Sequence, residues 1–209
     1  MPDDTRDPLS RERIVEAAIA LADANGLTGL SMRKVAADLG FEVMSLYNHI
    51  SNKQDLLRAM VEHVTDEVEL ASPDTDWKQA IRQHSIDTKE MFTRHPWVVG
   101  LWVSTIPGPR RFDHMEWVLA TLDRSGLDDR QAHDAFHAIG NHVVGYMLSN
   151  IAMPGNDDDL EHVMSEVMET LDEKRHVHVL QHIEQHANGD SGPSFEFVLD
   201  LLIAGIAGD

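Results

Sequence analysis

The segment from Ser31 to Leu57, SMRKVAADLGFEVMSLYNHISNKQDLL, contains two short helical patterns separated by a glycine. Ser31 is a favourable N-cap, and the apolar residues after it recur at helical spacing until Gly40 stops the helix. A second short helix is expected over residues 44–50, directly after this turn. Two helices of about two turns each, joined by a tight turn that contains glycine, are typical of a helix-turn-helix.

The second short helix has apolar residues on one side and polar or aromatic residues on the other. Leu46 and Ile50 lie four positions apart and are expected to face the neighbouring helices. Ser45 and Asn48 then face solvent, at positions that enter the major groove of DNA in this motif. Hydroxyl and amide groups bond to base edges, and Tyr, His and Lys side chains bond phosphates. The pattern indicates a DNA-reading surface, although the tyrosine and histidine of this helix are singly compatible with a core or helix-end role.

The sequence from Gly26 to Met60, GLTGLSMRKVAADLGFEVMSLYNHISNKQDLLRAM, resembles the DNA-binding domain of the TetR (tetracycline-repressor) family. The resemblance rests on the Gly-x-x-x-Leu-Ser-Met-Arg-Lys-Val-Ala entry, the Leu-Gly stop and the run Leu-Tyr-x-His-x-x-x-Lys-x-x-Leu-Leu. It spans about residues 11–60. By position it implies base contacts from Arg33, Val43, Met44, Ser45 and Asn48, and phosphate contacts from Ser31, Tyr47, His49 and Lys53.

The charge of the chain is unevenly distributed. The formal net charge of −19 is unfavourable for binding nucleic acid, because a phosphate-binding surface needs local positive charge. Residues 1–63 hold 7 Lys and Arg against 10 Asp and Glu, whereas residues 64–209 hold 10 against 26. The acidity therefore belongs mainly to the second part, which is expected to repel DNA from surfaces other than the reading face.

The composition is that of a soluble globular protein of 209 residues, with 42% hydrophobic and 25% charged residues. The chain has no cysteine, which excludes disulfides, thiolate metal sites and cysteine nucleophiles. No window approaches 18 uninterrupted apolar residues, and the N-terminal sequence is polar and acidic where a signal peptide is basic and then apolar. We therefore expect a cytoplasmic protein without membrane contact.

Helical periodicity recurs along almost the whole chain, so an all-α fold is expected. The first 65 residues form the expected helix-turn-helix DNA-binding domain, and residues 66–209 form a larger helical domain for ligand binding and dimerisation. A long helix over residues 53–71 is expected to join them. The further helices are predicted over residues 77–94, 97–104, 110–124, 128–152, 158–185 and 194–207.

Two of these helices have more apolar surface than one domain covers. The helix over residues 194–207 has only two charged side chains in its body, and the helix over residues 128–152 carries apolar or small residues along one face. With their symmetry mates they are expected to form the four-helix interface of a homodimer. A dimer also spaces two recognition helices for a palindromic operator in double-stranded DNA.

The second part also resembles the tetracycline-repressor branch of the family, which implies a cavity for a small-molecule effector. Trp102 and Ile106 stand where that branch has a metal-chelating histidine and an arginine, so tetracycline with magnesium is not the expected effector. Each aromatic ring is equally compatible with an ordinary core. The candidate effector-binding residues are Trp97, Trp102, Phe112, Met115, Trp117, Phe136, His137, Asn141 and Met147.

Histidines recur at helical spacing in two places, which leaves a metal-dependent alternative open. His178, His182 and His186 share one helix face, and His133 and His137 form a second pair. Such pairs chelate zinc or nickel, so a metal-sensing regulator or a hydrolase with a His and acid metal site is the alternative function. No HExxH motif, nucleophile motif or phosphate-cradling glycine loop occurs. The favoured prediction is therefore a ligand-responsive repressor without catalytic residues, metal or cofactor.

Overall fold

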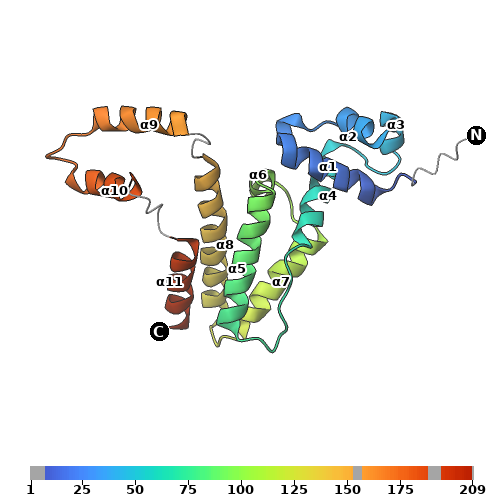
Figure 1. The fold of residues 1–209 in the computed structure, drawn as a ribbon. Coiled ribbons are helices and arrows are strands. Elements are labelled where there is room, and N and C mark those ends of the chain that lie inside the picture. Colours follow the sequence, from blue (N-terminus) through green and yellow to red (C-terminus); the bar gives the residue numbers. More distant parts are fainter. Residues whose placement is uncertain (1–7, 153–156, 188–193, 209) are drawn as a thin grey trace, which may run out of the picture. The chain divides into compact units, whose positions relative to one another are not determined.

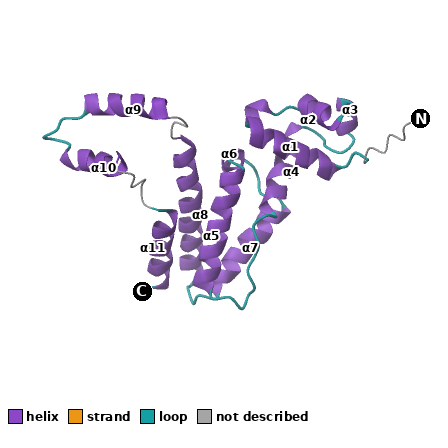
Figure 2. Cartoon of the chain, in the orientation of Figure 1, coloured by secondary structure: helices purple, strands orange, loops and turns teal. Residues whose placement is uncertain are grey.

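The computed structural model describes residues 8–152, 157–187 and 194–208. Every regular element in these three ranges is a helix, as Figure 1 and Figure 2 show, so the all-α prediction is confirmed. The chain divides into two compact units, residues 1–136 and residues 137–209.

The first unit begins with the predicted helix-turn-helix. α2 packs against both α1 and α3, and α1 also packs against α4. Gly40 ends α2 with a φ of 73°, a left-handed conformation that glycine adopts without strain, and the chain reverses there before α3. The segments are α1 (Arg11–Asn25), the 3-10 helix η1 (Leu27–Gly29), α2 (Met32–Leu39), α3 (Val43–Leu46) and α4 (Lys53–Thr65).

Side-chain caps fix where three of these helices begin. Ser10, Ser31 and Asn52 each accept a hydrogen bond from the backbone N–H three residues later. Each cap satisfies one N–H that has no partner within its helix, and contributes about 1 kcal/mol. The prediction that Ser31 is a cap is confirmed.

The core between these helices is closed to solvent. Each large side chain buried there stabilises the fold by about 1.5–3 kcal/mol. The fully buried side chains include Ile14, Val35, Leu46, Ile50, Leu56 and Met60, each 0% exposed.

α3 is shorter than the helix predicted over residues 44–50. Only Val43–Leu46 is α-helical, and the next three residues form turns. The backbone N–H groups of Asn48 and His49 donate to carbonyls three residues back, at 3.3 and 3.0 Å. The turns thus continue in a helical direction, and the side chains keep the order that the pattern predicts.

α4 ends at Thr65, so the helix predicted over residues 53–71 is too long. The Thr65 hydroxyl donates to the Val61 carbonyl at 2.7 Å, and the following residues form turns. Glu67 bonds to Arg94 and His95 on other elements. These side-chain bonds redirect the chain where apolar periodicity alone suggested that the helix continued.

The rest of the first unit is a helical body below α4. α5 (Trp77–Arg94), α6 (Trp97–Ser104) and α7 (Pro109–Asp123) form it together with the start of α8 (Asp129–Ala152). α4 packs against α6 and α7, and α5 packs against the same two helices. The body core includes Ile81, Met91, Phe92, Val98 and Leu122, each at most 1% exposed.

The second unit contains the rest of α8 and α11 (Phe195–Ala207), which contact each other. The His142 ring stacks on Phe195 at 4.7 Å between centroids, and His142 Nε2 lies 2.9 Å from the Phe195 carbonyl oxygen. Tyr146 meets the Phe195 ring edge-on at 5.2 Å. Ile139, Val143, Met147, Leu199 and Ile203 are also buried.

Two helices occupy the range predicted as one helix over residues 158–185. They are α9 (Asp157–Thr170) and α10 (Val177–Ala187). Between them, the Asp172 carboxylate accepts hydrogen bonds from the backbone N–H groups of Lys174 and Arg175, both at 2.9 Å. Aspartate offers the backbone this alternative to helical bonding, and the prediction missed it because the apolar spacing continues on both sides.

Candidate nucleic-acid interface and effector region

The residues around α3 divide into a buried and an exposed set. Leu46 and Ile50 are 0% exposed, whereas Met44 is 74% and Tyr47 is 43% exposed. Asn48 and His49 are exposed as well. The predicted division between buried apolar residues and exposed residues is therefore present in the fold. Of the other predicted contacts, Arg33 and Lys53 are exposed, and Ser31, Val43 and Ser45 are partly exposed.

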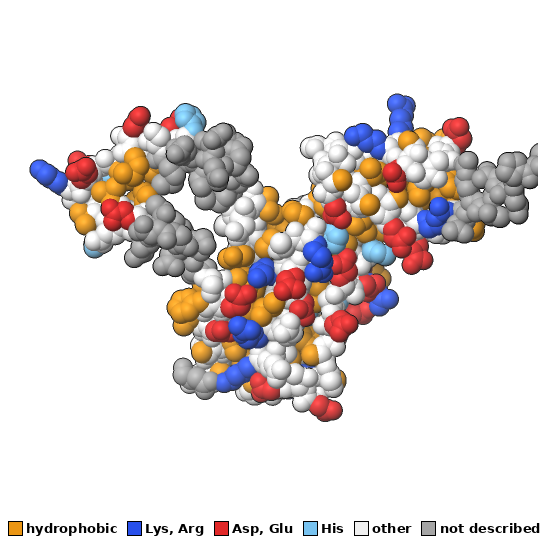
Figure 3. Space-filling view, in the orientation of Figure 1, with side chains coloured by type: hydrophobic (Ala, Val, Ile, Leu, Met, Phe, Trp, Pro, Cys, Tyr) orange, Lys and Arg blue, Asp and Glu red, His pale blue; other side chains and the backbone are white. Residues whose placement is uncertain are grey.

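The start of α2 brings two predicted phosphate contacts together. The Ser31 hydroxyl accepts from the backbone N–H of Lys34, and the Lys53 ammonium donates to the carbonyl of Leu30 at 3.0 Å. Lys53 is thus held beside the N-terminus of α2, where the helix dipole and the first N–H groups favour an anion. Figure 3 shows Lys and Arg side chains projecting from this part of the molecule.

Arg11 holds in place the end of the turn that follows α3, residues 47–49. Below, α3 and this turn together are called the recognition segment. Its guanidinium donates to the His49 carbonyl at 2.9 Å and to both oxygens of Asp55, at 3.1 and 2.7 Å. Asp55 also accepts from the backbone N–H of Ser51 at 2.9 Å. The bonds from Arg11 lower the pKa of the Asp55 carboxyl to about 2. The sequence did not indicate these bonds, because Arg11 is 38 positions from His49 and 44 positions from Asp55.

A shallow groove of about 540 Å³ lies between α1, α4 and the start of α7. Its lining mixes both signs of charge, with Arg11, Arg58 and Arg110 on one hand and acidic residues that include Asp55 and Glu62 on the other. Glu62 accepts hydrogen bonds from the backbone N–H groups of Gly108 and Arg110, at 3.1 and 2.8 Å. A side chain of α4 thus caps the N-terminus of α7.

The aromatic residues predicted for an effector cavity have separate partners in the first unit. The indole N–H of Trp97 donates to Asp23 on α1 at 2.6 Å, and that of Trp117 donates to the Ala71 carbonyl at 3.0 Å. Trp102 meets Phe92 edge-on at 5.2 Å. Phe112 is 53% exposed, and Met115 and Phe136 are partly buried. In the second unit, His137 and Asn141 are exposed and Met147 is buried.

Arg111 holds the C-terminus of α6 and was not predicted. It is 7% exposed, and its guanidinium carbon lies 4.4 Å from the Trp102 ring centroid. Its N–H groups donate to the Trp102 carbonyl at 2.7 Å and to the Thr105 hydroxyl at 3.2 Å. Burial lowers the pKa of Arg111. The side chain fixes the end of α6 before the chain turns into α7.

A pair of histidines joins α5 to α7. His84 Nε2 lies 3.2 Å from His114 Nδ1, and the His84 ring stacks on Trp117 at 5.1 Å between centroids. Burial, and then the neighbouring His114, lower the pKa of His84 to about 3. Burial also lowers the pKa of His114. Both rings are therefore neutral near pH 7, and one donates its N–H to the other.

Within the described residues, no group of three His, Asp or Glu side chains is placed to hold a metal ion. His178 and His182 are exposed on α10, and the side chain of His186 lies outside the described residues. The helices of the described ranges are all too short or too polar to cross a membrane.

The fold and the exposed recognition segment define a helix-turn-helix DNA-binding domain joined to a larger helical body. The family profile described as "Bacterial regulatory proteins, tetR family" matches residues 14–60, and the profile "Tetracyclin repressor-like, C-terminal domain" matches residues 70–208. The chain therefore belongs to the TetR family.

Named relatives and solved structures agree with this assignment. The repressor DrrR1 of Streptomyces coeruleorubidus is 39% identical over 146 residues, which cover 68% of this chain and 54% of that protein. The class E tetracycline repressor of Escherichia coli is 26% identical over 202 residues, covering 95% of this chain and 91% of that one. The structure of Streptomyces coelicolor ActR with actinorhodin is 27% identical, with a TM-score of 0.78, covering 97% of this chain and 100% of that one. The chain thus spans about half the length of DrrR1.

Proposed function

We propose that the chain forms a homodimeric transcriptional repressor that acts in the cytoplasm, binds a palindromic operator and leaves it when a small apolar or aromatic effector binds. The observation that carries the proposal is the recognition segment, where Leu46 and Ile50 are 0% exposed while Met44 and Tyr47 face solvent.

The expected contacts follow from these positions. Arg33, Val43, Met44, Ser45 and Asn48 are proposed to meet base edges, because they lie on or beside the two short helices that cross in this motif. A second set grips phosphates and fixes the orientation without reading sequence. That second set is Ser31, Tyr47, His49 and Lys53.

Exposed apolar surface in the second unit supports the proposed dimer. Leu148 and Ile151 on α8 are 44% and 47% exposed, and Phe197 and Leu201 on α11 are 58% and 57% exposed. Each of these side chains gains about 1.5–3 kcal/mol when it is fully covered. Pairing of both helices with their symmetry mates covers such surface and sets the distance between two DNA-binding domains.

The effector class is proposed from the aromatic composition of residues 97–117 and from the relative ActR. Crystal structures of ActR have been solved in complex with actinorhodin and with (S)-DNPA. In this proposal, residues 66–209 bind the effector and residues 1–65 bind DNA. An effector that prefers a dimer with wrongly spaced DNA-binding domains shifts the population away from the operator, by no more than its difference in affinity for the two states.

Selection of bound fragments from genomic DNA tests the proposal. The purified protein should enrich short palindromic sites, and Asn48→Ala should change the preferred base at one position of each half-site. Arg130→Ala, which removes an exposed cation at the start of α8, is the matched control and should leave the preference unchanged. Recovery of random fragments by the wild-type protein would overturn the proposal.

Truncation before Ser194 should give monomers or aggregates, and a stable truncated dimer would overturn the dimer interface.

A further inference from the structure

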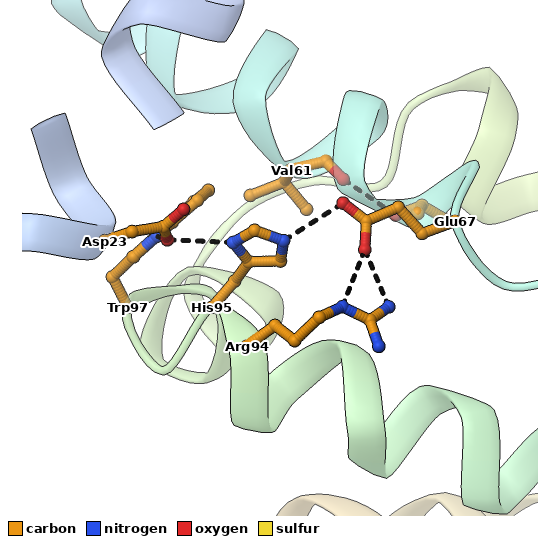
Figure 4. Close-up of polar contacts among 7 residues, drawn as sticks. Asp23, Val61, Glu67, Arg94, His95 and Trp97 are labelled. Atoms are coloured by element: carbon orange, nitrogen blue, oxygen red, sulfur yellow. Dashed lines mark hydrogen bonds and ion pairs between the residues drawn. The ribbon is translucent and has the colours of Figure 1, made fainter. Parts of the chain in front are cut away.

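His95 lies at the corner between α5 and α6 and contacts two other elements. The residue is 7% exposed. Its Nδ1 is 2.8 Å from the Asp23 carboxylate of α1, and its Nε2 is 3.0 Å from the Glu67 carboxylate just after α4, as Figure 4 shows. One buried ring therefore bridges the DNA-binding helices to the body of the first unit.

Both contacts require the ring to donate. An ionised carboxylate only accepts hydrogen bonds, so each of the two nitrogens must carry a proton to bond its partner. The bridge is complete when His95 is an imidazolium between two carboxylates. Charge-assisted bonds of this kind are stronger than neutral ones, and here they join a buried ring to two partly exposed carboxylates.

Each carboxylate of the bridge has a second anchor. Asp23 Oδ1 also accepts the indole N–H of Trp97 at 2.6 Å, and the Trp97 ring meets His95 edge-on at 5.9 Å. Glu67 Oε2 accepts from Nε of Arg94 at 3.1 Å and from its terminal nitrogen at 2.7 Å. Burial disfavours the ionised form of Glu67, but the bonds from Arg94 and His95 outweigh it and lower the pKa of Glu67. Both carboxylates are thus oriented toward His95 by their second partners.

The bridge joins parts that the chain connects only through α4. Helices α1 to α3, called the reading head below, carry the recognition segment, and α1 holds it through Arg11. If α4 were the only attachment, the head could pivot about the end of that helix. The contacts of His95 and Trp97 with Asp23 provide a second attachment, between α1 and the start of α6.

We propose that His95 is a positioning residue for operator binding: its bond to Asp23 locks the reading head against the α5–α6 corner, and so fixes the distance between the two heads of the dimer. The proposal rests on the proposed function. A dimer with pivoting heads has only a fraction of its population at the spacing of a palindrome, and its apparent affinity falls by that fraction. One head binding one half-site needs no spacing and escapes this loss.

Two substitutions separate the two bonds of the ring. His95→Gln places an amide N–H near Nε2 and keeps only the bond to Glu67, whereas His95→Asn places one near Nδ1 and keeps only the bond to Asp23. Thr93→Ala is the neighbouring control, since the Thr93 hydroxyl bonds only within α5 in the contacts described. Asp23→Ala removes the acceptor on α1, and with it the Trp97 bond as well as the His95 bond, and it replaces His95→Gln if that variant does not fold.

Affinity for a full palindrome and for a half-site duplex is the first measurement, on sites selected from genomic DNA. His95→Gln should bind the palindrome about tenfold more weakly and the half-site as tightly as the wild type. His95→Asn and Thr93→Ala should match the wild type on both duplexes. Equal losses on both duplexes, or no loss on the palindrome, would overturn the proposal.

The second measurement needs no DNA. Because the chain has no cysteine, spin labels at Ala37→Cys on α2 and Glu116→Cys on α7 report one distance within each chain. His95→Gln should widen this distance distribution about twofold, and His95→Asn should leave it narrow. An unchanged width in His95→Gln would overturn the lock even if no operator is found. Absence of DNA binding by the wild type, with the predicted widening, would instead refute the proposed function and leave the lock standing.

Discussion

Replacing Gly108 by alanine should destabilise the protein through a side chain of another helix. Gly108 precedes α7 with φ −95° and ψ −173°, a conformation that alanine adopts freely. A Cβ atom there would overlap the carboxyl group of Glu62, which reaches across from α4. The carboxylate must move, and it then loses its bonds to the backbone N–H groups of Gly108 and Arg110.

The expected cost follows from those two bonds. Hydrogen bonds to charged groups contribute about 1.5–3 kcal/mol each, and the partly exposed position of Glu62 argues for about 2 kcal/mol for the pair. Glu62→Ala should cost about the same. In the Glu62→Ala background the overlap is gone, and Gly108→Ala should stabilise by about 0.5 kcal/mol, because alanine restricts the unfolded chain. Gly108→Ala should thus destabilise the protein when Glu62 is present and stabilise it when Glu62 is replaced by alanine.

Urea unfolding followed by circular dichroism measures this cycle, at one fixed protein concentration because dimerisation adds to apparent stability. The double variant should be about 2.5 kcal/mol more stable than the sum of the single losses predicts. If Gly108→Ala is as stable as the wild type, or costs as much without Glu62 as with it, then the cap on α7 does not contribute as argued.

Three further predictions concern stability. Asp55 has a pKa of about 2 in the folded protein, below its ordinary value, so its contribution to stability is present above about pH 4 and is lost as the pH falls toward 2. Urea unfolding should show that Asp55→Asn costs about 1 kcal/mol at pH 7, after allowance for solvent screening, and little near pH 2. His84 has a pKa of about 3 in the folded protein, so the neutral ring stabilises the fold above about pH 6.5, and this stability is lost as the pH falls from 6.5 to 3. In the same assay, the stability of His84→Gln should therefore depend less on pH between 7 and 4 than that of the wild type. An equal pH dependence would contradict the neutral state of this ring. Leu46→Ala should cost about 2–5 kcal/mol in thermal unfolding, while Met44→Ala, at a 74% exposed position, should stay within about 0.5 kcal/mol, and similar losses for both would contradict the orientation of α3.

Much of the DNA-binding fold could be predicted from the sequence because local signals agree there. Ser31 caps α2, Gly40 adopts the left-handed conformation, and Leu46 and Ile50 are buried as their spacing indicates. Helix ends were harder to predict. Side chains just beyond two helix ends, Glu67 after α4 and Asp172 after α9, form hydrogen bonds there, and apolar periodicity carries no information about them.

The contacts that connect distant parts could not be predicted in the same way. Periodicity indicates which face of a helix is buried, but not which residue of another helix meets it. Asp23 and Trp97 are 74 positions apart, and Glu62 and Gly108 are 46 apart. Trp97 fitted a cavity wall by composition, yet its indole bonds to α1. Arg111 gave no signal, since a charged residue on a helix is usually solvated, and here it is 7% exposed.

Binding of the selected operator by the Tyr47→Ala/Lys53→Ala double variant shows whether the surface around α3 contacts DNA, with Arg130→Ala as control. Lys53 also bonds to the Leu30 carbonyl, so circular dichroism must first show that the double variant is folded. A folded double variant should bind about 100-fold more weakly across sequences, with a salt dependence reduced by about two counterions per dimer, because two phosphate-bound lysines are lost. Unchanged affinity and salt dependence in that folded variant would contradict the assignment of this surface to DNA.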